Sequence, residues 1–521
     1  MTDASPARSR STGLGADWIG LFAGLGLFLW SLGRHFLYMP DDTYITLIYA
    51  RNLAQHTELA WNLGERSEGY TSFLHVVILG GLIRAGLPPA TAAFAIALTA
   101  ALLLAIVAFR AARLVAPGPE TARARGLAVF SLLATPAVAV WTAGGLETVL
   151  NAVLMAAGLS CLLRAATDPR TYRSAALAGL CFSLAILTRL DNAPVIAAAG
   201  LVALIAGPGA LSRRLLLAVL VTGIPAAVAF AQMAVRFAYY DLAFPLPFYA
   251  KTGVPITLRL QNGISYFLIS LAWLPILFAG TAAALLGIRR GAGFAFALTS
   301  AAFAVQILFV LWAGGDHMLA GRLLLAAAFP TAMLLLVSGG HAATRPRLSL
   351  AAFAAAASLA AAILQPKSSA DPAAVVGEIV AEHIRESWPP GSLVALHTAG
   401  STPYFAPDMV YIDMLGLNDP TIALRSDYPQ TGGFQGFPGH AKGDGAYVLS
   451  RQPDFIIAGF AEGSPVEEGW FLSDVELASA AEFQRCYRRD TAEIAYDRRR
   501  FALGPDKPYP LIFTYYRRTC G

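Results

Sequence analysis

The chain of 521 residues is 56% hydrophobic and only 14% charged, and its mean hydropathy is +0.57. This composition excludes a soluble protein with a single anchor and predicts a polytopic α-helical membrane protein. The net charge of +5 does not indicate a nucleic-acid partner, because the basic residues fall in short loops between apolar runs, where they report topology.

The apolar runs predict about eleven transmembrane helices. They are expected near residues 18–38, 88–109, 126–142, 146–163, 175–188, 193–207, 215–236, 263–287, 293–312, 321–338 and 348–364. The first run is too long for a cleavable signal and is expected to stay as a transmembrane helix. Basic clusters place the N-terminus in the cytoplasm and the C-terminus outside. These clusters are Arg8 and Arg10, Arg110 to Arg125, Arg164 to Arg173, Arg213 and Arg214, Arg289 and Arg290, and Arg345 and Arg347.

The first external loop, residues 40–87, holds the first dense polar segment. Two crossings within residues 73–109 would put the Arg110 to Arg125 loop outside, so residues 71–85 are expected to form an interfacial or re-entrant helix. Asp41 and Asp42 follow Pro40 and precede a helical pattern. Asp42 suits a helix N-cap, but a second adjacent carboxylate adds repulsion. We therefore predict that one of the two is catalytic, Asp41 by preference.

The other external loops also carry ionisable residues. Charges at the ends of spans usually face a cavity or one another, so several loops are expected to meet at one external site. As alternatives, Glu147 could be a helix cap or first-turn acid, Arg189 and Arg322 could be interfacial residues, and Asp191 could be a salt-bridge partner of Arg189. The residues predicted to bind a donor are Glu147, Arg189, Asp191, Tyr249, Lys251, Asp316, His317 and Arg322.

Residues 366–521 are expected to form a soluble external α/β domain, and residues 1–365 the membrane module. An amphipathic helix is predicted at 371–388, buried strands at 393–397 and 454–459, and a helix at 443–452. Residues predicted to contact an acceptor are Glu68, Tyr70, Asn418, Asp419, His440 and Lys442, although Asn418 and Asp419 also suit ordinary turns.

Of the four cysteines, Cys161 and Cys181 fall in predicted membrane helices and are expected to pack there. Cys486 and Cys520 fall in the external domain, where an oxidising compartment favours a disulfide between them. No nucleotide-binding or zinc motif is present in the sequence. Oxygen ligands such as Asp41, Asp42 and Asp316 could hold Mg²⁺ or Ca²⁺, but their spacing does not require a metal.

A carboxylate at an external membrane surface, surrounded by Arg and Lys, suits glycosyl transfer from a polyprenyl phosphosugar. The lipid chain stays in the bilayer and basic side chains neutralise the phosphate, which then leaves without a general acid. One carboxylate takes the proton of the acceptor hydroxyl, which gives inversion in a single displacement. Glycosidases, in contrast, require two carboxylates.

The sequence resembles the C-type superfamily of membrane glycosyltransferases, and in particular the family of the mycobacterial terminal arabinofuranosyltransferase AftB. Relatives of that family in other bacteria include flagellar motor control proteins. The resemblance covers nearly the whole chain. Its motifs are DDTYITLIYARNLA (41–54), NLGERSEGYTSFL (62–74), GLET (145–148), LTRLDN (187–192), FYAK (248–251), GGDHMLAGR (314–322), LGLNDP (415–420) and GHAKGDGAYVLSRQPD (439–454).

This resemblance implies a multi-pass protein of a bacterial inner membrane, a polyprenyl-phosphate sugar donor, an envelope glycan acceptor, and an aspartate base at Asp41 or Asp42. The chain departs from similar sequences at Leu190 and Asn192, where Pro and Gly are expected, and at Pro247 and Phe248, where Asn and Thr are expected. These departures leave the sugar open, with a pentofuranose such as arabinose favoured. A non-catalytic envelope or flagellar-motor scaffold remains an alternative, and a transporter suits the external charges less well.

Overall fold

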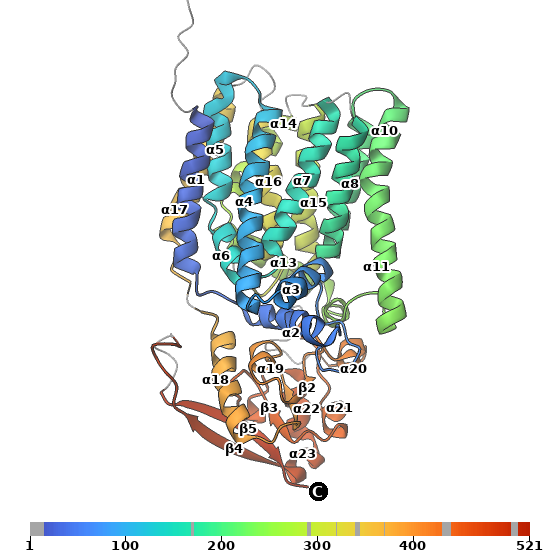
Figure 1. Cartoon of the computed structure of the whole chain (residues 1–521), viewed down its shortest axis with the longest axis vertical. Helices are drawn as coiled ribbons and strands as arrows, with labels where there is room; N and C mark the ends of the chain where they lie inside the picture. The colour runs from blue at the N-terminus through green and yellow to red at the C-terminus, as the bar shows by residue number, and fades with distance from the viewer. Residues whose placement is uncertain are drawn as a thin grey trace, which may run out of the picture.

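The structure is a computed structural model that describes residues 15–167, 171–288, 293–318, 320–338, 344–368, 370–429, 439–501 and 509–520. Arg8, Arg10, Arg170, Arg289 and Arg290 of the basic clusters lie outside these residues. A helical bundle occupies one end of the molecule and a smaller domain with a β-sheet the other (Figure 1).

The described residues up to Leu364 are mainly helical. Their α-helices are α1 (Ala16–His35), α2 (Asp41–His56), α3 (Phe73–Arg84), α4 (Pro89–Val115), α5 (Ala122–Leu133), α6 (Pro136–Gly144), α7 (Thr148–Thr167), α8 (Thr171–Thr188), α9 (Ala193–Ala206), α10 (Leu211–Ala218), α11 (Ile224–Tyr240), α12 (Leu246–Ala250), α13 (Ile256–Ser270), α14 (Ile276–Ile288), α15 (Phe294–Ala313), α16 (Ala328–Val337) and α17 (Thr344–Leu364). Short η-helices are η1 (Pro119–Thr121), η2 (Leu190–Asn192), η3 (Val219–Gly223) and η4 (Arg322–Ala327).

Six helices in the described part of the chain are long and apolar enough to cross a membrane, and they become seven if the pair formed by residues 119–133 and α6, bent by 41°, is counted as one span. Six of the expected crossings fall on these six helices, and the expected crossing at 126–142 falls on the bent pair. The other four fall on shorter apolar helices. The expectation of one straight crossing at 263–287 is wrong, because the chain breaks between α13 and α14, where Pro275 cannot donate a helical hydrogen bond.

Helices α2 and α3 lie at the end of the bundle, between it and the C-terminal domain (Figure 1). The interfacial helix expected at 71–85 is therefore α3, and it packs against α2. The two helices approach closely at Gly80, where a Cβ would lie 2.9 Å from Cδ2 of Leu53 in α2.

The C-terminal domain is built on a five-stranded sheet of order β2-β1-β3-β5-β4. Strands β1 (Leu393–Leu396), β2 (Val410–Asp413) and β3 (Phe455–Ile457) run parallel, while β5 (Leu511–Arg518) pairs antiparallel with β3 and with β4 (Tyr487–Ile494). The helices of this domain are α18 (Pro372–Ser387), α19 (Ser401–Phe405), α20 (Pro420–Leu424), α21 (Gly445–Ser450), η6 (Val466–Glu468), α22 (Leu472–Ser479) and α23 (Ala481–Cys486). The predicted disulfide between Cys486 and Cys520 is present and ties the chain end to the start of β4.

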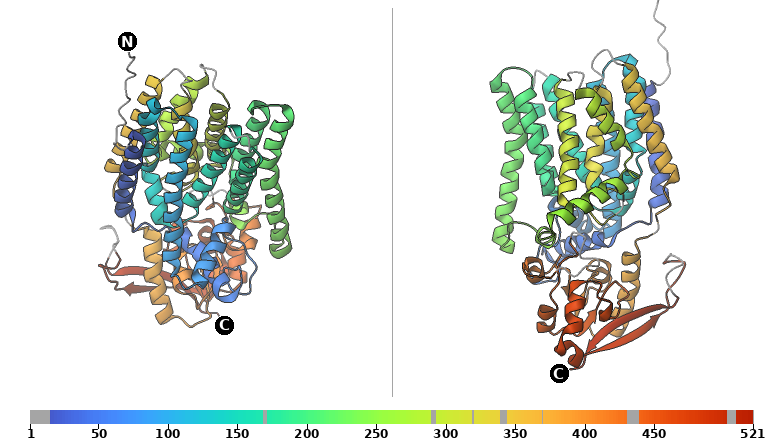
Figure 2. Two further views of the ribbon diagram at one scale, coloured as in Figure 1. Left: turned by 45° about the horizontal axis from the view of Figure 1, so that its top comes forward. Right: turned by 180° about the vertical axis from the view of Figure 1, so that it is seen from behind.

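The two parts of the molecule share a hydrophobic core. One cluster of buried side chains runs from Leu47 and Ile48 of α2 to Val380 of α18 and Leu396 of β1. The last turn of α17 and the start of the linker to α18 are also anchored, because Arg34 at the end of α1 donates hydrogen bonds to the carbonyl oxygens of Ala362, Ile363 and Gln365. Seen from two further sides, the C-terminal domain lies against the same end of the bundle (Figure 2).

Candidate active site

Asp41 and Asp42 form the first turn of α2, at the junction of the two parts of the molecule. The N-cap is Pro40, in an extended conformation, and no side chain caps the helix by a hydrogen bond. An N-cap role for Asp42 is therefore wrong. Both carboxylates still gain from the positive end of the helix dipole.

Asp41 is bonded to the C-terminal domain. Its carboxylate accepts hydrogen bonds from the backbone N–H of Gly400 at 3.0 Å, from the backbone N–H of Ser401 at 2.7 Å and from Oγ of Ser401 at 2.6 Å. Its own N–H donates to Oδ2 of Asp371 at 2.9 Å. Burial raises the pKa of Asp41 to about 7 even though these bonds lower it, and Asp371 and Asp42 add to the rise.

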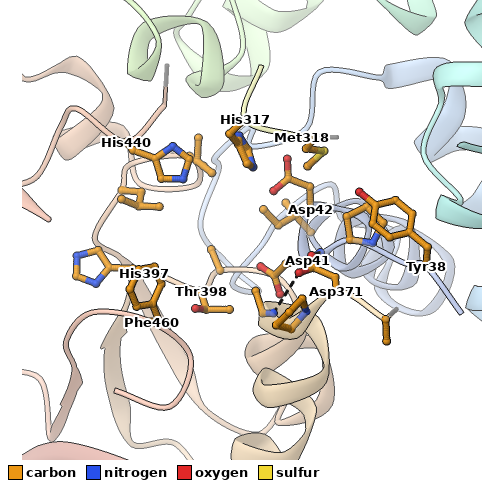
Figure 3. A pocket seen from close by; sticks show the side chains of 18 of the residues that line it. Tyr38, Asp41, Asp42, His317, Met318, Asp371, His397, Thr398, His440 and Phe460 are labelled. Atoms are coloured by element: carbon orange, nitrogen blue, oxygen red, sulfur yellow. Dashed lines mark hydrogen bonds between the residues drawn. The ribbon is translucent and has the colours of Figure 1, made fainter. Parts of the chain in front are cut away.

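Asp42 has different surroundings. In the part of the chain that the structure describes, no hydrogen-bond donor contacts its carboxylate. In Figure 3 this carboxylate is turned toward His317 and Met318. Asp42 lines two adjoining cavities, one of about 480 Å³ and one of about 70 Å³. It is therefore placed to meet two ligands at once.

The larger cavity lies between the bundle and the C-terminal domain. From the bundle side it is lined by Tyr38, Asp41, Asp42 and Trp273. The opposite wall is formed by residues just after the carboxyl ends of the parallel strands, where ligands commonly bind in such sheets. They are His397 and Thr398 after β1, Leu415 and Leu417 after β2, and Gly459 and Phe460 after β3.

The smaller cavity, called here the cationic cavity, is lined by Lys251, Arg322, His317 and His440 together with Asp42, Tyr70 and Glu147. Lys251 is exposed, and no carboxylate of the described residues lies within ion-pair distance of its ammonium group. Arg322 donates to Asp316, with their closest N and O atoms 2.6 Å apart. This cavity thus offers positive charge beside the carboxylate of Asp42.

Three of the residues predicted to bind a donor lie behind the cationic cavity. Asp316 does not line it but supports Arg322 and His317, whose Nδ1 lies 3.3 Å from Oδ1 of Asp316. Burial raises the pKa of Asp316, but Arg322 and His317 outweigh it and hold this pKa well below its usual range. Burial lowers the pKa of His317, but Asp316 outweighs it and raises this pKa. Arg189 pairs at 2.6 Å both with Glu147, which does line the cavity, and with Asp191.

Tyr249 and Glu68 also lie away from the two cavities at Asp42. Tyr249 packs against Phe244 and Phe248. Glu68 accepts two hydrogen bonds of 2.9 Å from Nε of buried Arg236, and burial raises the pKa of Glu68 to about 7 against the effect of that guanidinium. Glu68, Arg236 and Tyr70 line a third, largely apolar cavity of about 420 Å³ beside α11.

Three residues predicted to contact an acceptor have structural contacts instead. Asn418 donates to Asp413 at 2.9 Å and accepts from the hydroxyl of Tyr49 at 3.1 Å. Asp419 caps α20, which agrees with the alternative that it is an ordinary turn residue. Lys442 is buried and donates a hydrogen bond to the carbonyl oxygen of Ala423. His440 and Tyr70 do line the cavities.

Sequence patterns missed the contribution of the C-terminal domain to this site. Asp371 caps α18 and reaches Asp41, while His397, Gly400 and Ser401 follow β1. A position at the end of the predicted strand 393–397, or in the few residues after it, is the signal that could have found the last three. Among the described residues, no group of three or more His, Cys, Asp or Glu side chains is arranged to hold a metal ion, so no ligands are assigned to the possible Mg²⁺ or Ca²⁺.

Comparisons with known proteins address the fold. Residues 369–502 match a family described as a domain of unknown function, DUF8728. No curated protein matches the chain by sequence. ArnT from Cupriavidus metallidurans bound to undecaprenyl phosphate superposes with a TM-score of 0.50 and 16% identity, over 76% of this chain and 85% of ArnT.

The Archaeoglobus fulgidus oligosaccharyltransferase superposes as well. Its apo form matches with a TM-score of 0.53 and 13% identity, over 89% of this chain and 72% of that one. The same enzyme, under the name AglB, was solved in complex with an inhibitory peptide and a dolichol-phosphate. That structure gives the same TM-score and identity, over 88% of this chain and 72% of that one. The chain is a multi-pass membrane protein with the fold of the C-type glycosyltransferases and a C-terminal α/β domain.

Proposed function

We propose that this protein is a membrane glycosyltransferase that transfers a sugar from a polyprenyl-phosphate donor to a hydroxyl group of a cell-envelope glycan. One observation carries the proposal: Asp42, a carboxylate without a hydrogen-bond donor among the described residues, lies between a cationic cavity and a larger cavity. ArnT and AglB, which have the same fold, were solved with undecaprenyl phosphate and dolichol-phosphate, and this supports the class of donor.

In this proposal the donor phosphate binds in the cationic cavity. Lys251 and Arg322 neutralise its charge, so the lipid phosphate leaves without protonation. His317 lies beside them and is held toward its cationic form by Asp316. Glu147 and Asp316 keep the arginines Arg189 and Arg322 in place.

The acceptor occupies the larger cavity, between the bundle and the strand ends of the C-terminal domain. Asp42 takes the proton from the acceptor hydroxyl as the oxygen attacks the anomeric carbon, and the lipid phosphate departs from the opposite face. The configuration of the sugar is therefore inverted. The sequence favoured Asp41 as this base, but the three hydrogen bonds that Asp41 accepts make Asp42 the better candidate.

The resemblance to arabinofuranosyltransferases favours a pentofuranose as the sugar, and we place the chain in a bacterial inner membrane with its C-terminal domain on the outer side. The decisive experiment measures transfer of radiolabelled sugar from synthetic polyprenyl-phosphate arabinofuranose, and then from other phosphosugars, to membranes that contain the protein. We expect transfer by the wild type and its loss in Asp42→Asn, with residual transfer in Asp41→Asn.

Each other outcome has a defined meaning. Loss of transfer in Asp41→Asn alone would return the role of the base to Asp41. Equal transfer by the wild type and both variants would exclude a carboxylate base in this loop. An absence of transfer with every donor would leave the envelope or flagellar-motor scaffold as the working function.

A further inference from the structure

The first turn of α2 is held from outside the helix. Asp41 accepts three hydrogen bonds from Gly400 and Ser401, and its N–H donates to Asp371. All three partners belong to the C-terminal domain, more than 300 residues away in sequence. The contact is close, because a Cβ on Gly400 would lie 2.1 Å from the backbone oxygen of Asp41.

Asp42 has no comparable support of its own. Neighbouring residues of an α-helix differ in direction by about 100° around the helix axis, so fixing Asp41 toward the C-terminal domain sets the direction in which Asp42 points. That direction is toward the two cavities (Figure 3). A displacement of about 1 Å at a reacting group is enough to reduce a rate about a hundredfold.

We propose that Ser401 and Asp371 are positioning residues that act through Asp41 to hold Asp42 in line with both cavities. This inference rests on the proposed role of Asp42 and extends it. The C-terminal domain then completes the catalytic centre from outside the membrane module.

The competing explanation is that these bonds only dock the C-terminal domain onto α2. A contact at the other end of α2 provides a control that distinguishes the two explanations. There, Nη1 of Arg51 donates to the carbonyl oxygen of Tyr404 at 2.9 Å. This bond joins the same helix to the same domain. It lies ten residues from Asp41, about 15 Å along a helix. Arg51→Gln is therefore a matched control for weaker docking without loss of the Asp41 contacts.

The experiment compares the wild type, Ser401→Ala, Asp371→Ser and Arg51→Gln as full-length proteins. Serine at position 371 can still cap α18 but is too short to keep the bond to Asp41. For Ser401→Ala and Asp371→Ser we expect kcat to fall at least about tenfold and the donor KM to stay within about twofold, because the cationic cavity is intact. Arg51→Gln is expected to keep kcat within about twofold of the wild type.

A second measurement does not depend on activity. Hydrogen–deuterium exchange of the backbone amides of residues 41–44 should accelerate in Ser401→Ala and Asp371→Ser and remain at the wild-type rate in Arg51→Gln. Unchanged exchange in both variants, an unchanged kcat, or equal losses in all three variants would overturn the inference. If the wild type transfers no sugar, the proposed function fails, while the exchange rates still decide whether the domain holds this turn.

Discussion

At the scale of single residues, Asp41 and Asp42 show how two identical neighbouring side chains acquire different roles. Asp41 is half-buried and accepts three hydrogen bonds, whereas Asp42 faces two cavities. A buried carboxylate that is well bonded stabilises one arrangement of the chain, and a carboxylate without donors is available to bind a substrate proton. The sequence could identify the pair, but only the tertiary contacts separate its members.

The pKa of Asp41 gives a pH-dependent stability. Burial raises it from 3.8 to about 7, so the folded protein keeps a proton that the unfolded chain releases between those values. This contribution to stability is present at low pH and is lost as the pH rises through about 7, at roughly 1.4 kcal/mol per unit of pKa difference. We expect the thermal midpoint of the wild type to fall between pH 5 and pH 8 more steeply than that of Asp41→Asn. Parallel pH profiles would contradict this assignment.

Lys251 is the cation of the site without a carboxylate partner among the described residues. A hydrogen bond to a charged group contributes about 1.5–3 kcal/mol, so Lys251→Ala should raise the donor KM roughly 10- to 100-fold. Lys251→Arg keeps the charge and serves as the control. Initial rates over a range of donor concentrations test the prediction, and an unchanged KM in Lys251→Ala would remove this residue from the donor site.

At the scale of secondary-structure elements, local patterns were sufficient where a segment carries its own signals. The helix predicted at 371–388 is α18, with Asp371 as its cap and Pro372 in its first turn. The strands predicted at 393–397 and 454–459 are β1 and β3, and the helix at 443–452 is α21. The break between α13 and α14 was not predicted, because the apolar run around it is long enough for one membrane crossing and Pro275 was not treated as a helix breaker.

Local sequence patterns could not predict the contacts between elements. Glu68 and Arg236 are 168 residues apart, yet they form one buried ion pair. The sequence placed Glu68 in the catalytic loop as an acceptor ligand, since nothing local marks its distant partner. The same limitation applies to Ser401, whose hydroxyl bonds to Asp41 across 360 residues.

Helix α3 offers a test of packing at this scale. A Cβ on Gly80 would lie 2.9 Å from Cδ2 of Leu53, whereas a Cβ on Gly81 would meet nothing within 4 Å. Because Leu53 must shift to accept a methyl group at position 80, Gly80→Ala should raise the thermal midpoint less than Gly81→Ala does. Gly81→Ala should raise it, because alanine favours a helix over glycine by about 1 kcal/mol. Thermal unfolding in detergent compares the two, and equal behaviour would contradict this account of the α2–α3 contact.

At the scale of the whole molecule, the described basic loops and the C-terminal domain lie at opposite ends. The loop between α4 and α5 is at the end of the bundle farthest from the sheet (Figures 1 and 2). By the positive-inside rule we therefore expect the domain and the loop of residues 40–87 to lie outside the cytoplasm. The disulfide between Cys486 and Cys520 agrees with an oxidising compartment on that side.

Cysteine labelling in intact cells tests this orientation. In Cys486→Ser the thiol of Cys520 is free, and a membrane-impermeant maleimide that crosses the outer envelope should label it before lysis. In Glu120→Cys, an exposed position in the loop before α5, labelling should require lysis. The reverse pattern would invert the topology and exclude an external catalytic loop.

The position of Asp42 between two adjoining cavities also has a kinetic consequence. If each substrate has its own cavity, neither must leave before the other enters, and no sugar is stored on the protein between the two halves of the reaction. Plots of reciprocal rate against reciprocal donor concentration, at several acceptor concentrations, should therefore intersect rather than run parallel.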